Sequence, residues 1–179
     1  MYRINRPFLA SLLALTLVLP VNIYCIGNVL GAGLQFPLFR YQQTYLGTSL
    51  IFLTRDLDYV TTGILAGRTA LSICLGVVGT LLLIAAITFL IIRWQEEYEA
   101  ARKILSLLLA GAGVAYLASC VAQYGPLFHG PAGFCIPIGV PLIFGVAWWA
   151  YNAGEDDESG GAGDLPEPES DEVPSGDSR

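Results

Sequence analysis

Four cysteines are the side chains of this sequence that could share a chemistry, because thiols exchange electrons and form disulfides. They are Cys25, Cys74, Cys120 and Cys135, and no two form a CxxC motif. Three interpretations remain open from spacing alone. The thiols pack as small apolar groups between helices, they form structural disulfides such as Cys120 with Cys135, or they are redox-active. The wide spacing favours packing.

The other side chains that could take part in catalysis or bind a ligand lie in two places far apart in the sequence. His129 is the only histidine and lies between Gly-Pro breakers with no carboxylate nearby, which is typical of a surface loop. Arg55, Asp56 and Asp58 suit the solvated start of a helix, where carboxylates oppose the helix dipole. No motif for a nucleophile triad, a phosphate loop or a zinc helix occurs. The sequence therefore predicts no catalytic residue, no metal site and no bound cofactor.

The stretches without charged residues predict the helices that would position these side chains. Charged residues make up 13% of the chain, against about 25% in soluble domains. None occurs in residues 7–39, 69–92 or 104–154, which are 33, 24 and 51 residues long. A helix needs about 20 apolar residues to cross a bilayer, so these stretches predict one, one and two crossings. Long apolar runs without alternation exclude a membrane barrel.

The expected fold class is thus all-α, an integral membrane four-helix bundle. Pro20 is expected to kink the first helix beside Asn22, and Pro141 to distort the fourth. The transmembrane domain covers 1–152, with helices at about 8–30, 69–93, 104–123 and 134–151.

The connection between the first two crossings is expected to lie in the membrane interface. Arg40 and Arg55 bracket 14 uncharged residues, too few to span, yet aromatic side chains make the segment too apolar for a solvated loop. We predict an interfacial segment over 34–66, with a helix from about Thr54 to Ala66.

Acidic character is confined to the C-terminal end. Residues 153–179 hold ten acidic side chains and one basic, a charge of −9 within a total of −6, which leaves +3 for the rest. With almost nothing apolar to bury, this stretch is predicted to be a disordered acidic tail. Nucleic acid is excluded as a partner because phosphates would repel it.

Basic residues predict the orientation in the cell membrane. Cytoplasmic loops carry more Arg and Lys than outer ones. An inside N-terminus places Arg3, Arg6, Arg93, Arg102 and Lys103 in the cytoplasm and Arg40, Arg55 and Arg68 outside. We therefore predict a multi-pass protein with N- and C-termini both cytoplasmic. All four cysteines then fall in the outer third of their helices, a depth that would suit exchange with a quinone.

Three short runs carry a family resemblance. The acidic run Gly154 to Gly161, the run Ile136 to Pro141 and the run Val146 to Tyr151 are similar to the closing helix and tail of small four-pass haloarchaeal membrane proteins of unknown activity. The resemblance covers one helix and the tail, and it implies a membrane fold and a salt-adapted archaeal lineage.

We expect a non-enzymatic accessory or scaffold component that binds partners in the bilayer, because no ionisable residue falls within the predicted crossings. Its partners would be the lipid bilayer and other membrane proteins or further copies of the chain. Two alternatives are a membrane thiol-disulfide oxidoreductase, which would use the outer cysteines, and a small transporter or pore subunit.

Overall fold

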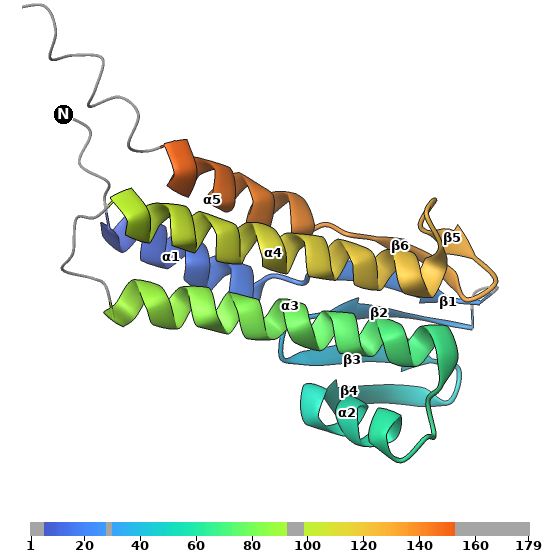
Figure 1. The fold of residues 1–179 in the computed structure, drawn as a ribbon. Coiled ribbons are helices and arrows are strands. Elements are labelled where there is room, and N and C mark those ends of the chain that lie inside the picture. Colours follow the sequence, from blue (N-terminus) through green and yellow to red (C-terminus); the bar gives the residue numbers. More distant parts are fainter. Residues whose placement is uncertain (1–5, 28–29, 93–98, 153–179) are drawn as a thin grey trace, which may run out of the picture.

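Four helices run side by side and a sheet extends from one end of their bundle (Figure 1). The computed structural model describes residues 6–27, 30–92 and 99–152. The bundle consists of α1 (Arg6–Val18), α3 (Gly67–Ile92), α4 (Glu99–Tyr124) and α5 (Val140–Asn152), and a shorter helix, α2 (Leu53–Thr61), lies beside the sheet. The two long helices, α3 and α4, run along both the bundle and the sheet, whereas α1 and α5 end where the sheet begins.

The sheet has six antiparallel strands in the order β4-β3-β2-β1-β6-β5. Four come from the connection between α1 and α3, and two come from the connection between α4 and α5. The strands are β1 (Asn22–Ile26), β2 (Gly31–Gln35), β3 (Phe39–Thr44), β4 (Gly47–Phe52), β5 (His129–Gly130) and β6 (Gly133–Ile136). Pairing of β1 with β6, for example Tyr24 opposite Cys135, joins the two connections into one sheet.

The all-α expectation is therefore wrong. The predicted interfacial segment 34–66 holds the end of β2, all of β3 and β4, and α2, and the predicted first helix, 8–30, ends at Val18 and gives way to β1. Strands of two to six residues produce only a short periodic signal. The pairing of β1 with β6 depends on residues more than 100 positions apart, which no local window detects.

Two prolines act at helix boundaries rather than inside helices. α1 ends at Val18, two residues before Pro20, and the next backbone N–H, of Val21, donates to the Gln35 carbonyl at 2.6 Å to open the sheet. Pro141 is the second residue of α5, where the helix needs no N–H donor from it. The predicted kink at Pro20 and the predicted distortion at Pro141 are therefore wrong, because one helix ends before Pro20 and the other begins next to Pro141.

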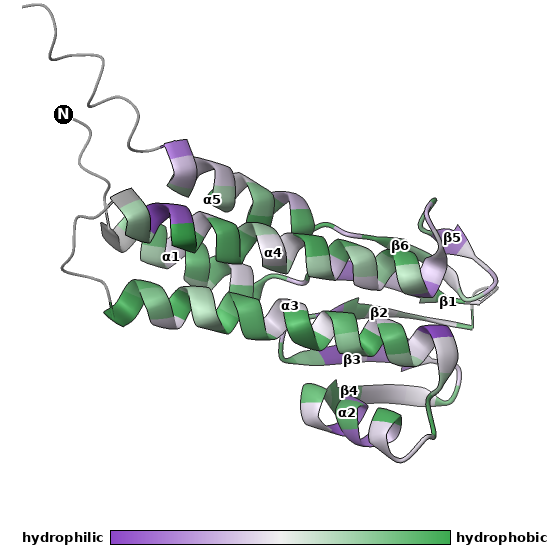
Figure 2. Cartoon of the chain, in the orientation of Figure 1, coloured by the Kyte–Doolittle hydropathy of each residue, from purple (hydrophilic) through white to green (hydrophobic). Residues whose placement is uncertain are grey.

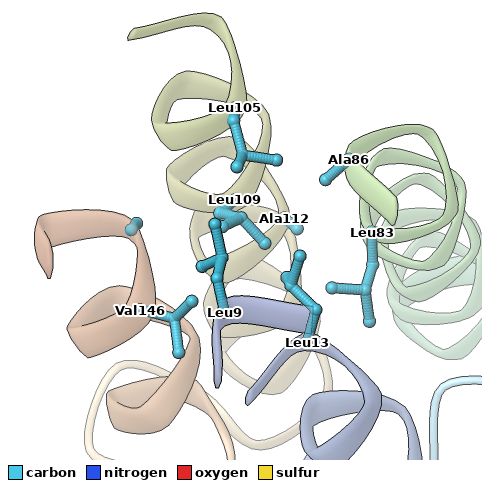
Figure 3. Packing of buried hydrophobic residues seen from close by; sticks show 9 residues of the cluster. Leu9, Leu13, Leu83, Ala86, Leu105, Leu109, Ala112 and Val146 are labelled. Carbon is cyan, nitrogen blue, oxygen red and sulfur yellow. The ribbon is translucent and has the colours of Figure 1, made fainter. Parts of the chain in front are cut away.

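The bundle is held by a core to which all four of its helices contribute (Figure 3). Leucine, alanine and valine side chains point to the common axis, and every member is at least nine-tenths buried. The members are Leu9 and Leu13 of α1, Leu83 and Ala86 of α3, Leu105, Leu109 and Ala112 of α4, and Val146 and Ala147 of α5. Burial of each large aliphatic side chain contributes about 1.5–3 kcal/mol.

A polar contact marks the level at which the bundle meets the sheet. The Thr80 hydroxyl lies 2.8 Å from the Pro37 carbonyl oxygen, to which it donates, and 2.9 Å from the Tyr116 hydroxyl. All three residues are buried. These bonds join α3, α4 and the turn between β2 and β3 at one point.

Apolar and polar residues are segregated along the long axis of the molecule (Figure 2). Hydrophobic residues dominate the four helices, and hydrophilic residues gather in the sheet, in α2 and at the far ends of α4 and α5. Within the described residues, two helices are long and apolar enough to cross a membrane, α3 and the part of α4 from Ala100 to Tyr124. The predicted acidic tail, 153–179, lies outside the described residues.

Candidate functional site

The side of the sheet that faces α3 and α4 carries polar side chains around a small cavity of about 60 Å³. Strand alternation places Asn22, Tyr24, Gln35 and Arg40 on this side. The lining is Asn22, Tyr24, Gln35 and Arg40 from the sheet, Asp56 from α2, Thr69, Ser72 and Ile73 from α3, and Ser119, Cys120, Gln123 and Tyr124 from α4.

Asn22 is the central donor of this site. Its side-chain nitrogen donates to the Gln35 side-chain oxygen at 3.1 Å and to the Cys120 sulfur at 3.4 Å. The residue is 4% exposed, and its own Oδ1 has no hydrogen-bond partner among the described residues. Its amide thus aims an unsatisfied acceptor into the site while it fixes the Cys120 thiol.

Arg40 and Asp56 bring opposite charges to the cavity. The Arg40 Nη2 donates to the Asp56 Oδ1 at 2.6 Å, while the Arg40 Nε has no partner within the described part of the chain. Burial raises the pKa of the Asp56 carboxyl above its usual range, although the Arg40 guanidinium acts in the opposite sense. The Arg40 guanidinium is therefore a charged donor in a mostly buried position.

Two serines fasten α3 to α4 at the edge of the cavity. The Ser72 hydroxyl donates to the Ser119 carbonyl oxygen at 2.9 Å, and the Ser119 hydroxyl donates to the Ser72 carbonyl oxygen at 2.7 Å. This reciprocal pair satisfies two hydroxyls and brings the helix axes close, as small residues allow.

Tyr24 closes the site toward β2. A side chain at Gly33 would overlap the Tyr24 ring, so the absence of a Cβ there lets the ring lie over the strand. The Tyr24 hydroxyl lies 3.4 Å from the Gln42 side-chain oxygen. Burial raises the pKa of Tyr24, so its phenol stays protonated and acts as a donor.

Of the four cysteines that the sequence suggested as redox or disulfide candidates, two lie close together and two are isolated. Cys120 and Cys135 are both buried and lie with Tyr24 in one cluster. Cys74 is exposed on α3, and Cys25 is half-buried on the opposite side of the sheet. All four are free thiols.

Comparisons of the chain with protein-family models, curated proteins and solved structures found no match.

The opposite side of the sheet carries a second, more open hollow of about 460 Å³. Its lining includes Cys25, Gln43, His129 and Phe134. His129 and Phe134 are register partners of β5 and β6, and Phe134 is opposite Cys25 of β1. His129 is thus exposed at the sheet edge, as expected for a residue of the hairpin between the last two helices.

Sequence reasoning missed the polar cluster as a unit. The sequence predicts that Asn22 lies within the first helix, beside the kink at Pro20, and it lies at the first position of β1 instead. It places Arg40 at the border of an interfacial segment and Asp56 at a solvated helix start, whereas both residues line the cavity together with residues of α3 and α4. Gln123 and Ser119 at the end of an apolar helix were the available signal, because polar residues there need partners.

Proposed function

We propose that this chain is a multi-pass integral membrane protein that acts as a non-enzymatic accessory or scaffold component and holds partners in and beside the bilayer. The observation that carries the proposal is the uncovered apolar surface of α3, whose most apolar 18-residue stretch is only 28% buried. The core helix of a soluble protein would be mostly covered, and a signal sequence would lie near the N-terminus. Lipid is the solvent that favours such a surface.

Helix lengths support a crossing by α3 and a crossing by α4, the candidate spans among the described residues. The 26 residues of α3 and of α4 extend about 39 Å, more than the hydrocarbon core of about 30 Å. The 13 residues of α1 and of α5 extend only about 20 Å. These two helices are therefore too short to cross alone, and they pack against α3 and α4 in the bundle core.

Basic residues support an inside N-terminus. Arg102 and Lys103 lie near the end of α4 that is remote from the sheet, and Arg40, Arg55 and Arg68 lie at the sheet end, spread over three elements. The denser basic end is the cytoplasmic one by the positive-inside rule. The proposal accordingly places the sheet outside the cell and both chain ends in the cytoplasm.

An apolar tip at the far end of the sheet supports a partner-binding role. Leu30, Tyr45 and Leu46 are all more than half exposed, and the Tyr45 N–H donates to the Leu30 carbonyl oxygen at 3.4 Å, so the two turns adjoin. Exposed apolar clusters outside lipid mark contacts with other molecules.

Membrane integration is tested by extraction. The full chain should stay in the membrane pellet after alkaline carbonate washing and dissolve only in detergent. Leu81→Arg, at an exposed position of α3, should reduce insertion, because an arginine near a helix centre costs about 2.5–3.5 kcal/mol. Thr62→Arg, in the turn after α2, is the matched control and should insert normally. A chain that is soluble without detergent would refute the proposal.

Orientation is tested by labelling intact cells with a membrane-impermeant maleimide. In a Cys25→Ser, Cys74→Ser background, Thr48→Cys on β4 should react from outside, and Ser175→Cys should react only after permeabilisation. The reverse pattern would overturn the orientation and leave the membrane assignment intact.

The partner-binding role is tested by photocrosslinking in native membranes. A benzophenone amino acid at Leu46 should give one protein adduct of discrete mass, and the same group at Thr62 should give none. Adducts to lipid alone at both positions would contradict a scaffold role.

The thiol-disulfide oxidoreductase alternative gains one observation, the contact of Cys120 with Cys135. Both thiols are buried, at 1% and 3% exposure, so a protein substrate cannot reach either sulfur in this conformation. Exchange with protein thiols is therefore the weaker candidate.

A further inference from the structure

Cys120 and Cys135 are brought together by the junction of two elements. Cys120 lies in the last turns of α4, and Cys135 lies in β6, after the β5–β6 hairpin has reversed the chain. The Cys135 N–H donates to the Phe128 carbonyl oxygen at 2.9 Å, which fixes the strand to the turn that follows α4. The two cysteine side chains therefore lie in one buried cluster.

The two thiols have different surroundings. The Cys120 sulfur accepts a hydrogen bond from the Asn22 amide at 3.4 Å, and no such amide contact reaches the Cys135 sulfur among the described residues. Hydrogen bonds donated to a sulfur stabilise its thiolate form. The neighbouring Cys120 side chain and burial raise the pKa of Cys135, which therefore stays a thiol. Cys120 is the better nucleophile of the two.

Only the nucleophilic sulfur faces the polar cavity. Cys120 lines the cavity of about 60 Å³, and Cys135 does not. That volume equals the share of about two water molecules. A disulfide reagent such as glutathione disulfide is far too large for it. The cavity therefore suits a molecule of about the size of two waters.

The unsatisfied atoms around the cavity define the polarity of such a molecule. Within the described residues, the Arg40 Nε is a donor without a partner, and the Asn22 Oδ1 and Gln123 Oε1 are acceptors without one. A molecule with two oxygens that both donates and accepts hydrogen bonds satisfies all three. Hydrogen peroxide has that size and that pattern.

We propose that Cys120 and Cys135 are a peroxide-reactive dithiol, in which hydrogen peroxide enters the polar cavity and converts the pair to a disulfide. The Cys120 thiolate attacks one peroxide oxygen, the O–O bond breaks, and the departing hydroxide takes a proton and leaves as water. Cys120 is now a sulfenic acid. The Cys135 sulfur then attacks the Cys120 sulfur and loses its proton, and the sulfenic hydroxyl leaves as a second water. Two thiols are oxidised, one peroxide is reduced, and the new S–S bond joins α4 to β6.

The principal experiment uses the unmodified full chain in detergent micelles. One equivalent of hydrogen peroxide should remove two thiols per chain, and peptide mass mapping should recover a Cys120–Cys135 crosslink that dithiothreitol reverses. Cumene hydroperoxide, which is too bulky for the cavity, should form this crosslink at least about tenfold more slowly. Equal rates with both peroxides, or oxidation of Cys25 or Cys74 before the pair, would overturn the proposal.

Two variants separate the roles of the residues. Cys135→Ser should stop after the first step, so that dimedone labels Cys120 in each chain that reacts. Asn22→Leu should slow crosslinking by about threefold, because a tenfold loss of thiolate is partly offset by its higher nucleophilicity. Cys25→Ser with Cys74→Ser is the matched control and should react like the unmodified chain. Absence of dimedone labelling in a folded Cys135→Ser chain, judged by unchanged circular dichroism, would refute the assignment.

The readout is independent of the proposed scaffold role. A chain that is inserted in the membrane and crosslinks a partner, but whose pair resists peroxide, would remove this inference alone. A chain whose pair reacts, but which dissolves without detergent, would remove the membrane role alone.

Discussion

Arg40 of β3 and Asp56 of α2 are joined by a 2.6 Å bond from Nη2 to Oδ1, the ion pair that ties the sheet to its neighbouring helix. Asp56 is 6% exposed. Arg40→Leu should destabilise the chain by about 1–3 kcal/mol, because it leaves a buried carboxylate without its donor. Thermal unfolding in detergent at pH 7 measures this. Arg55→Leu, which removes an exposed arginine of α2, should change stability by less than about 0.5 kcal/mol.

The same pair predicts a dependence on pH. Because burial raises the pKa of Asp56 above the unfolded value of 3.8, the folded chain holds this proton more tightly than the unfolded chain. Stability from this group is therefore greatest below pH 3.8 and is lost as pH rises through the folded pKa. Asp56→Asn lacks the titration, so its melting temperature relative to the unmodified chain should increase between about pH 4 and pH 7. A constant difference would contradict the direction of the shift.

The sequence predicted the helices far better than the sheet. The charge-free stretches located α3 and α4 to within a few residues, because an apolar run of that length is much longer than any ordinary strand. They could not reveal β1 and β6, since strands inside an apolar run look like helix continuations. Pro20 is the one local signal that α1 stops, and a kink is the wrong interpretation of it.

The candidate site was predictable only in part. Spacing allowed a bond between Cys120 and Cys135, and the fold places these two thiols in contact. Asn22, Arg40 and Gln123 could not be assembled, because they belong to β1, β3 and α4 and meet only through strand register. A polar cluster of this kind follows from three-dimensional pairing rather than from local pattern.

The contact of Thr80 with Pro37 predicts how the bundle depends on one hydroxyl. Thr80→Val should destabilise the chain by about 1–3 kcal/mol, because it leaves the buried Pro37 carbonyl without a donor and removes a partner of the Tyr116 hydroxyl. Thr88→Val, an exposed position eight residues along α3, is the matched control and should leave the melting temperature unchanged or raised. Equal effects of the two variants would show that the contact contributes nothing.

Two glycines inside helices, one at a helix contact and one exposed, predict opposite responses to a methyl group. A Cβ at Gly79 would lie 3.1 Å from the Tyr116 ring, whose hydroxyl is held by Thr80, so the ring cannot withdraw without losing that bond. Gly79→Ala should therefore destabilise the chain by about 1–3 kcal/mol through overpacking. Gly145 of α5 has no atom within 4 Å of the corresponding position, so Gly145→Ala should stabilise by about 0.5 kcal/mol through lower backbone entropy in the unfolded state. Melting temperatures of the two variants in the same detergent decide between them, and a gain for Gly79→Ala would mean that α3 and α4 have room between them for a further methyl group.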